Sequence, residues 1–187
     1  MKLLISLSDV DYSIPESDRA KFVSDECYRH ILRGVGGVFV LFPQMRSWFK
    51  GVRFTKKLTS SFDPWDRQLV LSVYGLDRSV EHADHALFKA NKPGFNVHET
   101  RGLDSLIAHE MGHAVDHWVR SVLKTQEDPD NLLKEYQDSK RFLHATLGNP
   151  SIYARANDSE WFAERFALEH LGQKKDLLNY LKERVQK

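Results

Sequence analysis

The sequence predicts an α+β fold, and the order of its patterns is what indicates this class. One amphipathic helical pattern opens the chain, short segments rich in β-branched and aromatic residues follow it, and helical patterns fill the rest of the chain. A length of 187 residues suits one hydrophobic core. We therefore expect a single domain over residues 1–187, in which an N-terminal helix and a small mixed sheet pack on a central helix and the C-terminal half is helical.

The N-terminal half is expected to hold one helix and several strands. Apolar residues recur at helical spacing over residues 15–34, and Gly34, Gly36 and Gly37 are expected to end that helix. Strands are expected at residues 38–42, 51–55 and 68–74, which carry short runs of strand-forming residues. A short helix is expected at residues 79–87, followed by a polar loop through Asn91, Pro93 and Gly94.

The C-terminal half is expected to be a series of helices. An apolar stripe of period 3.6 begins at Leu103 and continues to Val119. A second helix is expected at residues 130–147, ended by the sequence Gly-Asn-Pro. A third is expected to begin at Asn157 or Asp158, both good N-caps, and to end near Leu171. A closing helix is expected at residues 174–185.

Charge and cysteine content exclude several classes of protein. The formal net charge is +1, so no global field attracts nucleic acid or an acidic membrane. Cys27 is the only cysteine, which excludes an internal disulfide and a multi-cysteine metal site. Asp9 and Asp11 interrupt the apolar N-terminal run, and no segment reaches the roughly 20 apolar residues of a membrane span. We expect a cytoplasmic protein, or one secreted or delivered by a route that this chain does not encode; the oligomeric state is not indicated.

The most informative motif is the H-E-x-x-H sequence from His109 to His113, which lies inside the helix predicted from Leu103. Residues i and i+4 lie about 40° apart around a helix and about 6 Å apart along it. The imidazoles of His109 and His113 can therefore bind one tetrahedral Zn²⁺. Glu110 lies about 100° from His109 around the helix. Its carboxylate is thus placed beside the metal, where it can act as a general base.

A catalytic zinc needs a third protein ligand. Val119 stands where the third histidine of a metzincin would be, so that class is excluded. His117 lies about 80° and about 12 Å from His109 along the same helix, so we expect it to pack or orient rather than bind the metal. Glu160, in the opening turn of a later helix with Glu164 at i+4, is the better candidate. The alternative for Glu160 is an acid that complements the helix dipole.

Two segments, H-E-M-G-H-A-V-D (residues 109–116) and Y-A-R-A-N-D-S-E-W-F-A-E-R-F (residues 153–166), resemble the catalytic domain of anthrax lethal factor and its smaller relatives, including the clostridial Pro-Pro endopeptidases. The resemblance covers roughly residues 103–171. It implies a zincin-like metallopeptidase domain of the gluzincin type, with zinc held by His109, His113 and Glu160. It further implies that Glu110 is the general base and that Tyr153 donates a hydrogen bond to the oxyanion.

Glu164 and Asp116 match further acidic positions of that family pattern. They are expected either to orient the zinc-bound imidazoles or to be ordinary solvated acids. In zincins an edge strand holds the substrate in extended form. Residues 68–74 are predicted to form it, with residues 38–42 and 51–55 as alternatives.

The sequence thus predicts a zinc-dependent endopeptidase that acts on a peptide or protein substrate, without nucleic acid or membrane. One alternative is a non-catalytic zinc module of a larger virulence, mobile-element or virion system. Another is a nucleic-acid-associated metalloprotein, since residues 46–57 carry five basic and three aromatic side chains and no acid. His82 and His85 form H-x-x-H but lack a third partner in sequence, so they are expected at a polar helix surface.

Overall fold

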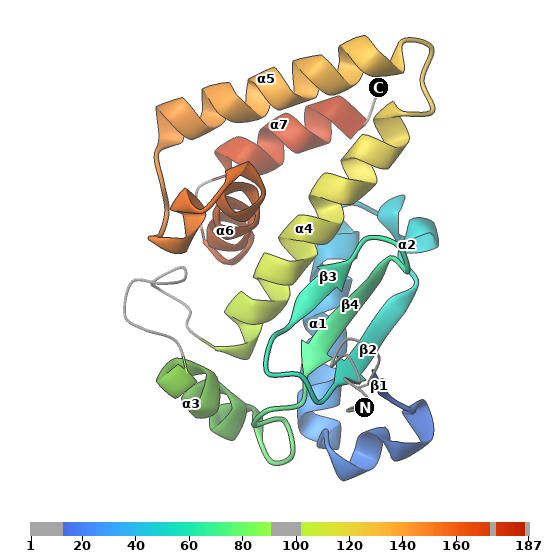
Figure 1. The fold of residues 1–187 in the computed structure, drawn as a ribbon, viewed down its shortest axis with the longest axis vertical. Helices are drawn as coiled ribbons and strands as arrows, with labels where there is room; N and C mark the ends of the chain where they lie inside the picture. Colours follow the sequence, from blue (N-terminus) through green and yellow to red (C-terminus); the bar gives the residue numbers. More distant parts are fainter. Residues whose placement is uncertain (1–12, 91–101, 173–174, 186–187) are drawn as a thin grey trace, which may run out of the picture.

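The computed structural model describes residues 13–90, 102–172 and 175–185, and its elements form a mixed α+β fold (Figure 1). The predicted loop through Asn91, Pro93 and Gly94 lies outside the described residues, as does the N-terminal run of residues 1–12. None of the helices in the described part combines the length and apolar composition needed to cross a bilayer. The elements are β1 (Ser13–Ile14), η2 (Glu16–Lys21), α1 (Asp25–Leu41), α2 (Met45–Trp48), β2 (Gly51–Thr55), β3 (Ser61–Asp63), β4 (Gln68–Ser72), α3 (Val80–Ala90), α4 (Leu103–Leu123), α5 (Pro129–Leu147), η3 (Tyr153–Arg155), α6 (Asp158–Leu171) and α7 (Asp176–Val185).

The four strands form one mixed sheet in the order β1-β2-β4-β3. β2 and β4 pair in parallel, whereas β1 and β3 pair antiparallel with their neighbours. The prediction that residues 68–74 form an edge strand is wrong, because β4 lies between β2 and β3. The edge beside α4 is β3, which was not predicted because three residues are too few to show an alternating pattern.

Helix α1 continues through the glycines that were expected to end it, so residues 38–41 are helical and the predicted strand at residues 38–42 is wrong. Close packing is the physical reason. A Cβ atom at Gly34 would lie 3.0 Å from Ile107 of α4, and one at Gly37 would lie 3.5 Å from the ring of His170 of α6. Gly34 lets α1 approach α4 closely, and this contact offsets the poor helix propensity of glycine, whereas a side chain at Gly37 would make an ordinary van der Waals contact.

Helix α4 lies between the two halves of the fold, with the sheet and α1 on one side and α5, α6 and α7 on the other (Figure 1). Its N-terminus is capped from α3, where the Asp84 carboxylate accepts the backbone N–H of Leu103 at 2.8 Å. Its apolar stripe is buried as predicted, including Ile107, Met111 and Val115. α4 therefore presents one face to each half of the molecule.

Helices α4 and α6 cross in close contact at Gly112. A Cβ atom at this position would lie 2.8 Å from the Cα of Ala163. Phe42, at the end of α1, contacts the rings of both Trp118 of α4 and Phe166 of α6, at centroid distances of 5.8 and 6.5 Å. The crossing brings the H-E-x-x-H motif against the start of α6.

Candidate metal centre

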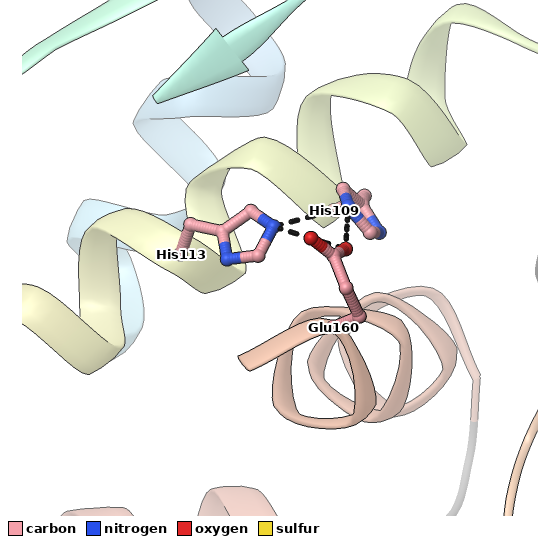
Figure 2. A group of neighbouring side chains, drawn as sticks. All are labelled: His109, His113 and Glu160. Carbon is pink, nitrogen blue, oxygen red and sulfur yellow. Dashed lines mark hydrogen bonds and ion pairs between the residues drawn. The ribbon is translucent and has the colours of Figure 1, made fainter. Parts of the chain in front are cut away.

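The candidate site lies where α4 faces the first turn of α6. His109 and His113 project from adjacent turns of α4 toward Glu160 of α6 (Figure 2). Asn157 caps α6, and its side-chain oxygen accepts the backbone N–H groups of Ser159 and Glu160, each at 2.9 Å. This cap fixes the turn that carries Glu160, while Trp161 and Phe162, both fully buried, hold the helix against the core.

Three ligand atoms converge on one point between the helices. The Nε2 atoms of His109 and His113 are 3.2 Å apart, and Glu160 Oε2 lies 3.2 Å from the first and 3.4 Å from the second. Glu160 Oε2 is buried and faces the Nε2 atoms of both imidazoles. These three side chains form the one group of at least three histidine, cysteine or acidic residues in the described part of the chain that could hold a metal ion. The structure therefore brings together the three predicted ligands.

Each imidazole is oriented through its other ring nitrogen. Glu164, whose side chain is 1% exposed, places Oε1 at 2.6 Å from Nδ1 of His109, as expected for an orienting carboxylate. Ser159 places Oγ at 3.1 Å from Nδ1 of His113. No sequence pattern pointed to Ser159, since a serine in the first turn of a helix is common without a partner. One imidazole is thus supported by a carboxylate and the other by a hydroxyl.

The electrostatics of the cluster favour a cation between the side chains. Burial lowers the pKa of His109, but its contacts with Glu160 and Glu164 outweigh burial and raise this pKa to about 10. Burial raises the pKa of Glu160, but its contacts with the two imidazoles outweigh it and hold this pKa at about 2. Glu160 therefore carries a negative charge across the whole neutral range, as a metal ligand must.

Glu110 lies beside the ligands rather than among them. Its side chain is buried and accepts a hydrogen bond from the backbone N–H of Phe62 on β3. Burial raises the pKa of the Glu110 carboxyl above its usual value, and the two nearby imidazoles act against that rise. A carboxylate with a raised pKa is suited to take up a proton near neutral pH.

Tyr153 comes from η3, the short segment that precedes α6. Its ring centroid lies 5.8 Å from that of His109, and its hydroxyl is hydrogen-bonded to Glu160. Burial and the charge of Glu160 raise the pKa of Tyr153 above its ordinary value. The phenol is therefore protonated at neutral pH, and it can act as a hydrogen-bond donor at the site.

Asp116 neither orients a predicted ligand nor is solvated, so both expectations for it are wrong. Its carboxylate lies in a buried network, where it accepts hydrogen bonds from Tyr136 Oη at 2.7 Å, Lys140 Nζ at 2.8 Å and Arg120 Nε at 3.1 Å. Asp116 follows His113 by three residues on α4, but its side chain meets α5 instead of the imidazoles. Its role in the structure is to join α4 to α5.

The remaining candidate residues lie apart from the cluster. The ring of His117 packs against that of Phe62, with the ring centroids 5.7 Å apart. His117 is not among the three converging residues, in agreement with the expectation that it packs. Cys27 is fully buried on α1. In the basic segment 46–57, Arg53 pairs with Asp63 at 3.4 Å. Of its aromatic residues, Phe54 is buried, and Trp48 and Phe49 are partly buried and pack against the core.

Comparison with known proteins gives no match for this chain, whether to a protein-family model, to a curated protein or to a solved structure. Its function is therefore inferred from the geometry and chemistry of the site.

Proposed function

We propose that this protein is a zinc-dependent endopeptidase of the zincin class, with His109, His113 and Glu160 as the metal ligands. The spacing of the ligand atoms supports zinc. In tetrahedral coordination with bonds of about 2.0–2.1 Å, ligand atoms lie about 3.3 Å apart. The three distances between the ligand atoms here are 3.2, 3.2 and 3.4 Å. Two imidazoles and one carboxylate also leave a fourth position open, as catalytic zinc sites require.

Glu110 and Tyr153 supply the other groups that peptide hydrolysis needs. A bound zinc lowers the pKa of water and polarises the scissile carbonyl. Glu110 takes a proton from the attacking water and gives it to the nitrogen of the leaving amine. Tyr153 turns its hydroxyl from Glu160 to the developing oxyanion, to which it donates a hydrogen bond.

The substrate is expected along β3. This strand is an edge of the sheet and lies against α4, so its outer side can pair with an extended peptide through main-chain hydrogen bonds. Phe62 of β3 already donates its N–H to Glu110, so a peptide bound along the strand is brought close to the general base. A peptide or protein chain is therefore the substrate class that the site favours.

The decisive experiment separates the base from the ligands. The Glu110→Gln variant should bind one zinc per chain, as the unchanged protein does, but should lose cleavage of a diverse peptide mixture by at least about 100-fold. The Glu160→Ala variant should lose zinc as well, whereas His117→Ala, on the same helix as the motif, should keep both. Loss of zinc in Glu110→Gln, or unchanged cleavage, would overturn the assignment.

Two other functions receive less support from the site. A non-catalytic zinc module has no use for a buried carboxylate such as Glu110 beside the ligands, and zinc binding without any cleavage in the experiment above would favour that alternative. A nucleic-acid-binding protein needs exposed stacking groups, but in segment 46–57 Phe54 is buried, and Trp48 and Phe49 are partly buried against the core. A steep salt dependence of RNA or DNA binding would support that function.

A further inference from the structure

The two imidazoles of the site differ in what holds them. His109 donates through Nδ1 to Glu164, an acid that the lethal-factor resemblance already suggested. His113 meets instead the hydroxyl of Ser159, which neither the motif nor the resemblance assigned to any role. A histidine that binds metal through Nε2 must carry its single proton on Nδ1, and a partner for that proton fixes both the tautomer and the ring.

The direction of the hydrogen bond follows from the position of His113. Its Nε2 faces Glu160 Oε2 at 3.4 Å and Nε2 of His109 at 3.2 Å, so this is the nitrogen whose lone pair is directed at the metal position. When a metal occupies that position, Nδ1 holds the proton and donates it to Ser159 Oγ, which lies 3.1 Å away. The opposite tautomer would place its proton in the metal position and would exclude the metal.

Ser159 is itself held in place by the cap of α6. Its backbone N–H is bound by Asn157, and the same side-chain oxygen binds the N–H of Glu160. A single helical turn therefore carries both the third ligand and the group that orients the second ligand. The position of Ser159 relative to Glu160 is set by helix geometry, because the two are adjacent residues.

We propose that Ser159 is a positioning residue that holds His113 with its proton on Nδ1 and its Nε2 lone pair free for the metal. This inference rests on the proposed function in one respect, namely that His113 is a metal ligand. A neutral hydroxyl attracts the Nδ1 proton less strongly than a carboxylate does, so the contribution of Ser159 is mainly to geometry and tautomer.

Two measurements test the role of Ser159, one of them without metal. Nitrogen-15 NMR of metal-free protein at pH 8 should show a larger share of the Nδ1-protonated tautomer of His113 in the unchanged protein than in Ser159→Ala. Zinc affinity, measured by competition with a chromophoric chelator, should fall about tenfold or more in Ser159→Ala. The variant Ser159→Thr, which keeps the hydroxyl, should restore both properties.

The control is Ser121→Ala, the same substitution on α4, where the hydroxyl donates to the carbonyl of Trp118. It should leave zinc affinity and the His113 signals unchanged. If Ser159→Ala keeps the zinc affinity and the His113 tautomer of the unchanged protein, the role of Ser159 is refuted while the metal site stands. If the unchanged protein binds no zinc, the proposed function itself fails.

Discussion

The charge state of His109 shows how the surroundings of one residue govern the chemistry of the site. With a pKa of about 10, this imidazole is protonated at neutral pH in the metal-free protein, because it lies between Glu160 and Glu164. A metal ion that binds Nε2 must displace that proton. The side chain therefore changes from a cation to a neutral ligand when metal binds.

We predict that zinc binding at pH 7.5 releases about one proton from His109, and that zinc affinity rises about tenfold for each pH unit between pH 6 and 8. The sign follows from the raised pKa, since acidification favours the protonated imidazole that competes with zinc. Titration calorimetry in buffers of different ionisation enthalpy measures the proton count. A heat of binding that is the same in all buffers would contradict the prediction.

Lys140 forms the second unusual electrostatic feature, because its ammonium group is only 3% exposed and pairs with Asp116. We predict that Lys140→Met lowers the free energy of unfolding by about 3 kcal/mol, since it leaves a buried carboxylate without its main cation. Under conditions in which the variant is fully folded, its zinc affinity should stay within about threefold of that of the unchanged protein, because Asp116 does not contact the ligands. Urea unfolding and metal titration check the two parts.

The matched control for Lys140→Met removes a charge from a pair at the surface. Arg184 pairs with Glu135, which is 49% exposed, at 2.9 Å. Arg184→Met should cost at most about 1 kcal/mol, because water screens this pair. If both variants lost a similar free energy of unfolding, burial would not explain the larger effect expected for the Lys140–Asp116 pair.

At the scale of the elements, the sequence predicted what depends on a regular period and missed what depends on packing. α4, α5 and α6 were predicted close to their bounds because their stripes or caps are local signals, as with Asn157. The continuation of α1 through Gly34 depends on its close contact with Ile107 of α4, which is distant in sequence. No local pattern could have shown that this glycine lies in a helix.

The glycines of α1 can be distinguished by substitution. Within the described part of the chain, a Cβ atom at Gly36 would meet no neighbouring atom within 4 Å, whereas one at Gly34 would meet Ile107 at 3.0 Å. We predict that Gly36→Ala raises the free energy of unfolding by about 0.5–1 kcal/mol, because alanine loses less backbone entropy in a helix. Gly34→Ala should instead lower it by about 1 kcal/mol or more through overpacking. Chemical denaturation of both variants is the measurement, and equal gains would contradict the close contact of α1 with α4.

At the scale of the whole molecule, the site joins parts of the chain that are distant in sequence. Two ligands follow from a motif within one helix, and their spacing could be predicted from residues 109–113 alone. The meeting of Glu160 with them depends on the crossing at Gly112, and Ser159 takes part only because that crossing is close. The resemblance could suggest which residues meet across the crossing, but only the folded structure brings them together.

Because the proposed ligands come from both α4 and α6, a metal bound by them would join two helices that belong to different parts of the chain. We predict that zinc at about 100 times its dissociation constant stabilises the fold by about 2.7 kcal/mol, since the unfolded chain does not hold the three ligands together. The thermal unfolding midpoint should rise with zinc concentration in the unchanged protein and in Glu110→Gln. It should not rise in Glu160→Ala, because that variant lacks the ligand from α6. A zinc-dependent rise in Glu160→Ala equal to that of the unchanged protein would show that the metal binds α4 alone, and the link between the two helices would then have to be abandoned.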